Sequence, residues 1–230
     1  MKAILLAAGF GTRLRPLTNT IPKCMVPIKG KPLIQVWLEK LWNASVSSVL
    51  INTHYLSAQV EAFINNSVFK EQSIIVFEPE LLGTAGTLLK NISFFQDEDG
   101  ILIHADNYCE ADFNKFIDAH NNRPPGCLMT MMIFRTYDPS SCGIVELDTN
   151  GVVIGFHEKV TNPPGNLANG AVYILSAEMI SLIKTEFSNK TDFSTEILGS
   201  FVGKIYTYLT EETFVDIGTI ENYNKVNQIA

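Results

Sequence analysis

The first 38 residues hold six basic side chains and no carboxylate, although the whole chain has a formal net charge of -7. These basic residues are Lys2, Arg13, Arg15, Lys23, Lys29 and Lys31. They surround a turn-rich segment with Gly9 and Gly11, which directly follows the apolar run 2–8. Glycine lets a backbone approach a phosphate closely, and successive N–H groups can bind its oxygens. The segment therefore predicts a phosphate site whose positive charge comes from Arg13 and Lys23.

Two known phosphate motifs do not describe this segment. A dinucleotide-binding fingerprint requires a third small residue where Leu14 stands, and Gly30-Lys31-Pro32 lacks the upstream glycine and the Ser or Thr of a P-loop. A Gly-x-Gly pair by itself is a weak signal. The alternative is a structural turn whose basic side chains are solvated or ion-paired.

Two aspartates stand at the ends of short apolar runs. Asp106 follows the run 101–105, and Asp216 follows 213–215, more than a hundred residues later. A pair of carboxylates, together with phosphate oxygens and waters, is the ligand set that Mg²⁺ favours. The pair therefore predicts a magnesium site if the fold brings the two residues together. The alternative for each is an aspartate that caps the loop after a strand.

A further turn of small residues, Gly83-Thr84-Ala85-Gly86, lies between a predicted strand and a predicted helix. Small residues there allow a flat ring to lie against the backbone. An ordinary helix start with Thr84 as N-cap is the alternative.

The elements that must position these residues alternate between strand and helix in the first half of the chain. Helical spacing predicts a helix at 32–42, and Ser57 is the expected N-cap of the next one. The predicted strands are 2–8, 48–51, 73–77 and 101–105, and the predicted helices are 32–42, 57–64, one from 83, and 112–120. Such alternation predicts a mostly parallel sheet with helices on both faces and ligands at the carboxyl ends of its strands.

The second half has a mixed pattern. The turn Asp148–Gly151 joins two predicted strands and is a strong hairpin signal. Strands are predicted at 128–134, 143–147, 152–156, 170–175, 204–209 and 213–215, with helices near 178–184, 194–198 and from 220. This part is therefore expected to be α/β without strict alternation.

Length and composition limit the class of protein. A chain of 230 residues with 46% apolar composition can form one α/β domain. Four scattered cysteines, Cys24, Cys109, Cys127 and Cys142, suggest neither a zinc site nor a disulfide framework. The apolar start is too short for a signal peptide or a membrane span. We therefore expect a cytoplasmic protein that binds a small anion and neither nucleic acid nor membrane.

The basic opening resembles the N-terminal motif of the sugar-1-phosphate nucleotidyltransferases. The matching run is Leu6-Ala-Ala-Gly-Phe-Gly-Thr-Arg-Leu-Arg-Pro-Leu-Thr18, followed by Pro22-Lys23 and Pro27. The run Leu82-Gly-Thr-Ala-Gly86 resembles mannose-1-phosphate guanylyltransferase-like members of that family. The segments around Asp106 and Asp216 resemble the two metal-binding aspartate segments, although His104 departs from the small or apolar residue that is common there.

The resemblance implies specific roles on the nucleotide side. Arg13, Lys23 and Asp106 are the implied catalytic residues, and Asp106 and Asp216 the implied ligands of Mg²⁺. The implied nucleotide-binding residues are Ala7, Ala8, Gly9, Gly11, Thr12, Arg13, Lys23, Glu80, Gly83 and Thr84. Glu80 could accept hydrogen bonds from guanine, whereas His54 is more simply explained as a capping or core residue.

The resemblance also implies residues that bind the sugar-1-phosphate. Three segments occur along the chain in the same order as the sugar-phosphate contacts of this family. The residues concerned are Gly143, Glu158, Lys159, Asn169 and Gly170. An exposed Glu158-Lys159 ion pair and a simple turn at Asn169-Gly170 are the alternatives.

The resemblance covers residues 2 to about 223 and implies a Rossmann-like three-layer α/β/α nucleotidyltransferase domain with a mostly parallel central sheet. One domain over 1–230 is expected, with a nucleotide-binding half at 1–122 and a sugar-phosphate-binding half at 123–230. The implied reaction is Mg²⁺-dependent transfer from a nucleoside triphosphate to a sugar-1-phosphate, giving a nucleotide-diphosphate sugar and pyrophosphate.

The sequence identifies the base and the sugar less specifically than it identifies the reaction. GTP and a mannose- or heptose-type sugar are favoured, and a homo-oligomer is compatible with the sequence. A uridylyl-, thymidylyl- or cytidylyltransferase acting on another phosphorylated small molecule is one alternative. An inactive nucleotide-sugar sensor of the same fold is the other, and loss of a metal aspartate or the loop arginine would favour it.

Overall fold

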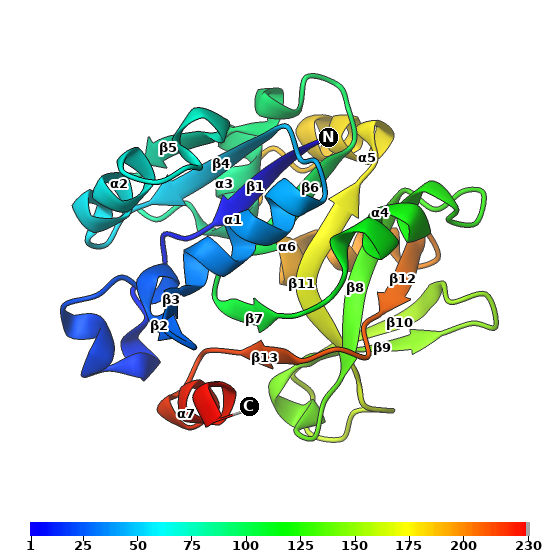
Figure 1. Cartoon of the computed structure of the whole chain (residues 1–230). Helices are drawn as coiled ribbons and strands as arrows, with labels where there is room; N and C mark the ends of the chain where they lie inside the picture. The colour runs from blue at the N-terminus through cyan, green and yellow to red at the C-terminus, as the bar shows by residue number, and fades with distance from the viewer. Residues whose placement is uncertain (229–230) are drawn as a thin grey trace. The chain divides into compact units, whose positions relative to one another are not determined.

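The computed structural model describes residues 1–228, which form two compact units (Figure 1). The first unit consists of Met1–Leu81, Ile103–Glu110 and the described residues from Thr213 onward. The second consists of Leu82–Leu102 and Ala111–Glu212. The predicted class, α/β with a mostly parallel central sheet, is confirmed. The predicted single domain with halves at 1–122 and 123–230 stays a prediction.

The longer strands of the first unit pair in parallel. β1 (Lys2–Leu6) pairs in parallel with β4 (Ser48–Thr53), which pairs in parallel with β5 (Ser73–Phe77). The strand order is β6-β1-β4-β5, where β6 (Gly100–His104) ends in this unit. Because parallel strands end at the same edge, the loops after β1, β4 and β6 begin close together.

Two helices of the first unit match the predicted ones. α1 (Leu33–Asn43) buries Leu33, Trp37 and Leu41 at helical spacing, and Pro32 precedes it. α2 (Ser57–Asn65) begins without a side-chain cap. The expected N-cap Ser57 is wrong: it is the first helical residue, and Leu56, in the left-handed region at φ 51°, takes the N-cap position.

The remaining elements of the first unit are short. β7 (Asn107–Cys109) pairs antiparallel with β13 (Phe214–Asp216), and α7 (Ile220–Gln228) follows β13 (Figure 1). A second ribbon pairs β2 (Pro27–Ile28) with β3 (Lys31–Pro32). The β7–β13 ladder joins segments that lie about half the chain apart in sequence.

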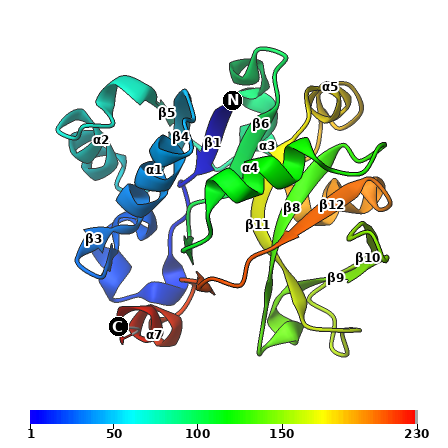
Figure 2. The ribbon, with the colours of Figure 1, turned by 45° about the vertical axis from the view of Figure 1, so that its right-hand side comes forward.

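The strand pairings within the second unit are mostly antiparallel; its strands are labelled in Figure 2. β9 (Gly143–Leu147) and β10 (Val153–Glu158) form the hairpin predicted at Asp148–Gly151. β11 (Leu167–Leu175) pairs antiparallel with β8 (Met129–Arg135) and with β9, and β12 (Ile205–Leu209) pairs in parallel with β8. The predicted mixed character of this part is confirmed.

The helices of the second unit are α3 (Gly83–Lys90), α4 (Phe113–Asn121), α5 (Ala177–Glu186) and α6 (Phe193–Glu196). Asp112 and Ser176 cap α4 and α5 by accepting N–H bonds from the first turn. Within residues 1–228, no helix is both long and apolar enough to cross a membrane.

Candidate functional site

The loop after β1 is held at its start by the neighbouring strand. The amide of Ala7 donates a hydrogen bond of 2.7 Å to Oδ1 of Asn52, and both residues are buried. Asn52 lies at the end of β4, opposite Leu6 in the parallel register. A side chain thus replaces the strand partner that the backbone loses as it leaves the sheet.

The glycine loop turns sharply at Gly11. This residue has φ 62°, in the left-handed region that favours glycine, and its carbonyl accepts a 2.7 Å hydrogen bond from the hydroxyl of Thr18. A Cβ atom on Gly11 would lie 3.0 Å from Cβ of Lys23. No heavy atom lies within 4 Å of a Cβ built on Gly9. Gly11 is therefore needed for packing, whereas Gly9 faces open space.

Lys23 lies between the two predicted metal aspartates. Its Nζ is 2.8 Å from Oδ2 of Asp106 and 3.9 Å from Oδ1 of Asp216. Lys23 is buried, whereas the side chains of Asp106 and Asp216 are 41% and 48% exposed. The three residues, predicted from distant segments, are thus brought together within the first unit.

The β7–β13 ladder explains this meeting. Asp106 lies between β6 and β7, and Asp216 is the last residue of β13, opposite Asn107. The amide of Ile217 also donates to the carbonyl of Asp106, at 3.0 Å. Backbone pairing therefore holds the two aspartates in adjacent positions on neighbouring segments.

Charge keeps Asp106 ionised. Partial burial raises the pKa of its carboxyl, but the neighbouring Lys23 and His104 outweigh burial and hold the pKa below the ordinary value. His104, which departs from the family pattern, thus contributes to the electrostatics of this aspartate.

Arg13 reaches the same place from the glycine loop. A Cβ built on Gly218 would lie 2.9 Å from Nη2 of Arg13 and 2.9 Å from each carboxylate oxygen of Asp216. Gly218 therefore leaves room for a guanidinium and a carboxylate at one point. Arg13, Lys23, Asp106 and Asp216 form one cluster, which we call the cation–carboxylate cluster.

Two carboxylates with exposed oxygens fit the hard, oxygen-preferring Mg²⁺ ion if substrate oxygens and waters complete its coordination. Among residues 1–228, no three His, Cys, Asp or Glu side chains gather as a potential metal site. The cluster therefore fits a shared magnesium site and does not form a complete protein cage.

Aromatic side chains lie beside the glycine loop. The ring of His54 is 5.2 Å from that of Phe10 and 6.4 Å from that of Phe77, and its Nδ1 lies 2.7 Å from the carbonyl oxygen of Glu78. These contacts agree with the structural explanation for His54. Glu80, the predicted base contact, is exposed.

Gly83 and Thr84 belong to the second unit. Thr84 is inside α3, whose N-cap is Leu82, so the alternative of Thr84 as N-cap is wrong. Its hydroxyl accepts a hydrogen bond of 2.7 Å from the amide of Phe193.

The predicted sugar-phosphate residues also lie in the second unit. Gly143 is opposite Glu158 in the β9–β10 register, and a Cβ on Gly143 would lie 2.6 Å from Oε2 of Glu158. Lys159 has φ 49°, and its Nζ is 3.5 Å from Oε1 of Glu158. The side chain of Lys159 is 66% exposed, so its ammonium is accessible to an anion.

Asn169 lies on the strand next to this hairpin. Its Nδ2 donates to the hydroxyl of Tyr173 at 2.8 Å, and its Oδ1 accepts from the amide of Ala171 at 2.9 Å. Gly170 lies between them, at an irregular point of the β11–β8 register. The alternative of a simple turn at Asn169-Gly170 is therefore wrong, because both residues lie within β11, where its register with β8 shifts.

Sequence reasoning missed three positioning residues. Asn52 holds Ala7, Thr18 holds Gly11, and Glu196 binds the loop that contacts Gly83–Gly86. A polar residue at the carboxyl end of a buried parallel strand could have identified Asn52. The other two depend on contacts that no local pattern reports.

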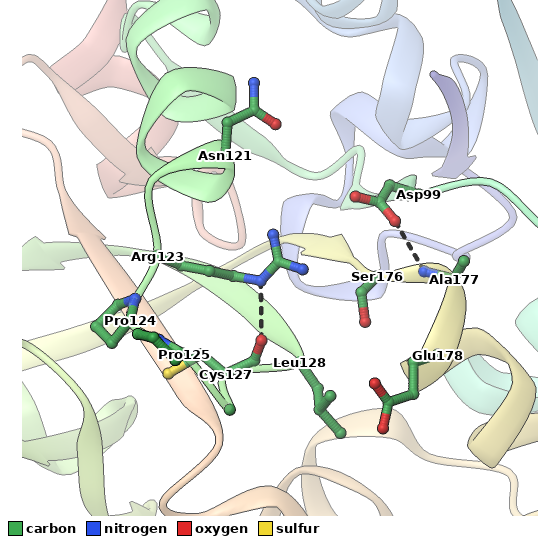
Figure 3. A pocket seen from close by; sticks show the side chains of 11 residues that line it. Asp99, Asn121, Arg123, Pro124, Pro125, Cys127, Leu128, Ser176, Ala177 and Glu178 are labelled. Atoms are coloured by element: carbon green, nitrogen blue, oxygen red, sulfur yellow. Dashed lines mark hydrogen bonds between the residues drawn. The ribbon is translucent and has the colours of Figure 1, made fainter.

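A separate pocket of about 460 Å³ lies in the second unit, and none of the predicted site residues is among those that line it (Figure 3). The Nε of Arg123 donates to the carbonyl of Cys127 at 2.8 Å, and Asp99 accepts from the amide of Ala177 at 2.8 Å. The pocket is therefore bordered by groups that hold the start of α5 and the end of α4.

Known proteins are similar to this chain in sequence and in fold. A sequence profile described as nucleotidyl transferase matches residues 2–230. The mannose-1-phosphate guanylyltransferase of Mycobacterium tuberculosis is 30% identical over 224 residues, covering 96% of this chain and 62% of that protein. The UTP–glucose-1-phosphate uridylyltransferase of Synechocystis sp. is 31% identical over 242 residues, covering 97% and 61%. The chain thus spans about three-fifths of the length of these curated relatives.

Solved structures match over nearly the full length of both chains. HddC from Yersinia pseudotuberculosis has a TM-score of 0.82 at 27% identity, covering 99% of this chain and 98% of that chain. Its complex with GMP-PN has a TM-score of 0.80 at 28% identity, with the same coverage.

Proposed function

Because the chain belongs to the nucleotidyl transferase family, we propose that it transfers a nucleotidyl group from a nucleoside triphosphate to a sugar-1-phosphate. The products are a nucleotide-diphosphate sugar and pyrophosphate. The names of the relatives support this class of reaction.

The observation that carries the proposal is the cation–carboxylate cluster. Lys23 lies within 4 Å of both Asp106 and Asp216, and Arg13 borders Asp216 at Gly218. Both aspartate side chains are about half exposed, so substrate oxygens and a cation can reach their carboxylates. Two accessible carboxylates, together with basic side chains beside a glycine loop, suit a metal-bound triphosphate.

The residues of the loop have distinct parts in the proposed reaction. The open backbone at Gly9 gives a phosphate access to loop N–H groups, and the Arg13 guanidinium matches terminal phosphate oxygens. The ammonium of Lys23 neutralises charge on the α-phosphate. An oxygen of the sugar-1-phosphate forms the new bond to the α-phosphorus, and the bond to the β-phosphate oxygen breaks to release pyrophosphate.

No general base is required, because the attacking phosphate oxygen is already anionic near neutral pH. Positioning and charge neutralisation then supply most of the rate enhancement. Mg²⁺, held by Asp106 and Asp216, would neutralise charge on the triphosphate and orient it.

The hairpin residues of the second unit suit the sugar-1-phosphate. Lys159 offers an exposed ammonium, and Glu158 lies beside it with a carboxylate that can accept from sugar hydroxyls. Gly143 leaves room next to that carboxylate.

For the substrates, we propose GTP and a mannose- or heptose-type sugar-1-phosphate. Support comes from the guanylyltransferase relative and from the HddC complex with GMP-PN. UTP with a glucose-type sugar is the second candidate, because a uridylyltransferase is equally similar.

The test is a pyrophosphate-release screen of the nucleoside triphosphates against mannose-, heptose- and glucose-1-phosphate, with and without Mg²⁺. The expected result is Mg²⁺-dependent release that is fastest with GTP. Lys23→Ala and Asp106→Ala should each lower kcat/KM by about 100-fold or more. Lys31→Ala, which removes an exposed ammonium paired with Glu39, is the matched control and should leave the rate unchanged. Variants at Lys23 and Asp106 that keep turnover near the parental rate would overturn the proposal.

A further inference from the structure

The carboxylate of Glu196 holds the loop that precedes α6. Its Oε2 accepts hydrogen bonds from the amide of Thr191 at 2.8 Å, from the Thr191 hydroxyl at 3.1 Å and from the amide of Asp192 at 2.9 Å. Its Oε1 lies 3.4 Å from Nζ of Lys190. One side chain therefore fixes three consecutive loop residues, which we call the 190–192 loop.

The 190–192 loop in turn binds the first turn of α3. The carbonyl oxygen of Thr191 accepts from the amide of Ala85 at 2.9 Å and from that of Gly86 at 3.5 Å. The Thr84 hydroxyl lies 3.4 Å from Oδ2 of Asp192. The amides of Ala85 and Gly86 belong to the first turn of α3, where N–H groups have no acceptor within the helix. The carbonyl of Thr191 supplies that acceptor.

The approach of the two segments is close enough to require a glycine. Gly83 has φ 76°, and a Cβ built on it would overlap the carbonyl oxygen of Thr191. Thr191 can therefore occupy its position only because residue 83 has no side chain. A shift of the loop would move the start of α3 or leave its amides without an acceptor.

Glu196 keeps its charge throughout the usual pH range. Hydrogen bonds from the amides of Asp192 and Thr191 lower its pKa to about 2. The carboxylate is therefore ionised at every pH at which an enzyme assay would be run.

Phe193, the first residue of α6, follows the 190–192 loop and packs against β11, the strand that also carries Asn169. The ring of Phe193 lies 4.9 Å from that of Tyr173, whose hydroxyl accepts from Asn169. Phe193 and Tyr173 are fully buried. This contact does not use the Glu196 carboxylate. It depends on apolar packing, whereas the 190–192 loop is held by hydrogen bonds.

We propose that Glu196 is a positioning residue for nucleotide binding. Through the Thr191 carbonyl it sets the Gly83–Gly86 turn, which is part of the nucleotide side of the proposed function, on which this inference rests. Removing Glu196 should weaken nucleoside triphosphate binding more than sugar-1-phosphate binding.

The experiment compares Glu196→Ala and Glu196→Gln with a matched control, Asp148→Ala. Asp148 also holds a turn of the second unit by accepting from backbone amides, of Asn150 and Val152. Binding of GTP, measured by calorimetry with Mg²⁺, should weaken about tenfold in Glu196→Ala, equivalent to ~1.4 kcal/mol. Glu196→Gln keeps an acceptor oxygen and should restore part of the affinity, whereas Asp148→Ala should bind as the parent does.

Steady-state kinetics provide a second readout. In Glu196→Ala the KM for the nucleoside triphosphate should rise about tenfold, while kcat and the KM for the sugar-1-phosphate change by less than about threefold. A general loss of stability would affect all three alike. Parental GTP affinity in Glu196→Ala, or equal weakening in Asp148→Ala, would overturn the inference.

Hydrogen exchange separates this inference from the proposed function. The amides of Ala85 and Gly86 should exchange faster in Glu196→Ala than in the parent and in Asp148→Ala. If the parent binds GTP but releases no pyrophosphate, the proposed reaction fails while the affinity comparison still decides the role of Glu196. If those amides exchange at the parental rate, the role of Glu196 is refuted even in an active enzyme.

Discussion

Asn52 accepts a buried hydrogen bond of 2.7 Å from the amide of Ala7. The bond spans β4 and the residue that follows β1, so it stands where the parallel ladder ends and the glycine loop begins. The geometry of the proposed phosphate loop therefore depends on a side chain of the neighbouring strand.

Asn52→Ala should lower the free energy of unfolding by about 1–3 kcal/mol, because the Ala7 amide would be buried without an acceptor. It should also raise the KM for the nucleoside triphosphate, since the loop loses its fixed start. Denaturant unfolding and steady-state kinetics measure the two effects. Asn65→Ala, at an exposed helix end, is the control. A change at Asn52 within about 0.5 kcal/mol, as for ordinary surface substitutions, would contradict this expectation.

Gly218→Ala should lower activity more than stability. The new Cβ would lie 2.9 Å from Nη2 of Arg13 and from the Asp216 carboxylate, so one of these charged groups must move. Both are ends of flexible side chains, and we therefore expect little change in Tm. A displacement of this size at reacting groups should lower kcat/KM by about 10- to 100-fold.

The control for Gly218→Ala is Gly199→Ala, because no heavy atom lies within 4 Å of a Cβ built there. Kinetics and thermal unfolding of both variants make the comparison. Equal kcat/KM in the two variants would show that the space at Gly218 is not needed.

Asp99→Asn should make the stability of the protein depend less on pH in the acidic range. A hydrogen bond from the buried His120 is the largest of the effects that lower the pKa of Asp99, and the amide of Ala177 adds to it. A carboxyl whose pKa is lowered on folding stabilises the protein above its unfolded pKa, and this contribution is lost as pH falls through the folded pKa. The parent should therefore lose stability on acidification more steeply than Asp99→Asn.

Thermal unfolding between neutral pH and the onset of acid denaturation measures this effect. Glu186→Gln, a neutralising change at the exposed end of α5, serves as the control and should follow the parental curve. If the Tm of the parent and that of Asp99→Asn fell equally as the pH was lowered, the role of Asp99 would be refuted.

Most secondary structure could be predicted, because most of the longer elements have a local signal. The apolar runs ending before Asp106 and Asp216 form β6 and β13, and the Asp148–Gly151 turn forms its hairpin. The start of α2 was misjudged, because Ser57 has the right residue type for an N-cap but the chain turns one residue earlier, at Leu56. Preference for a cap is a local tendency that backbone geometry can override.

Candidate site residues could be chosen from the sequence, but not their contacts. The resemblance selects Lys23, Asp106 and Asp216, while the 2.8 Å contact between Lys23 and Asp106 depends on tertiary structure. Glu196 has no resemblance or local pattern to mark it, since its partners are backbone amides of a loop whose role depends on a separate helix.

The sequence by itself determined an acid-free basic loop after a buried strand, two aspartates at strand ends, and the family to which these motifs belong. Only the tertiary structure decided that the aspartates meet at Lys23 and that Thr191 binds the start of α3. The physical reason is that periodicity and turn residues report local conformation and burial. Pairing between β7 and β13 depends instead on the free energy of the whole fold, to which distant segments contribute together.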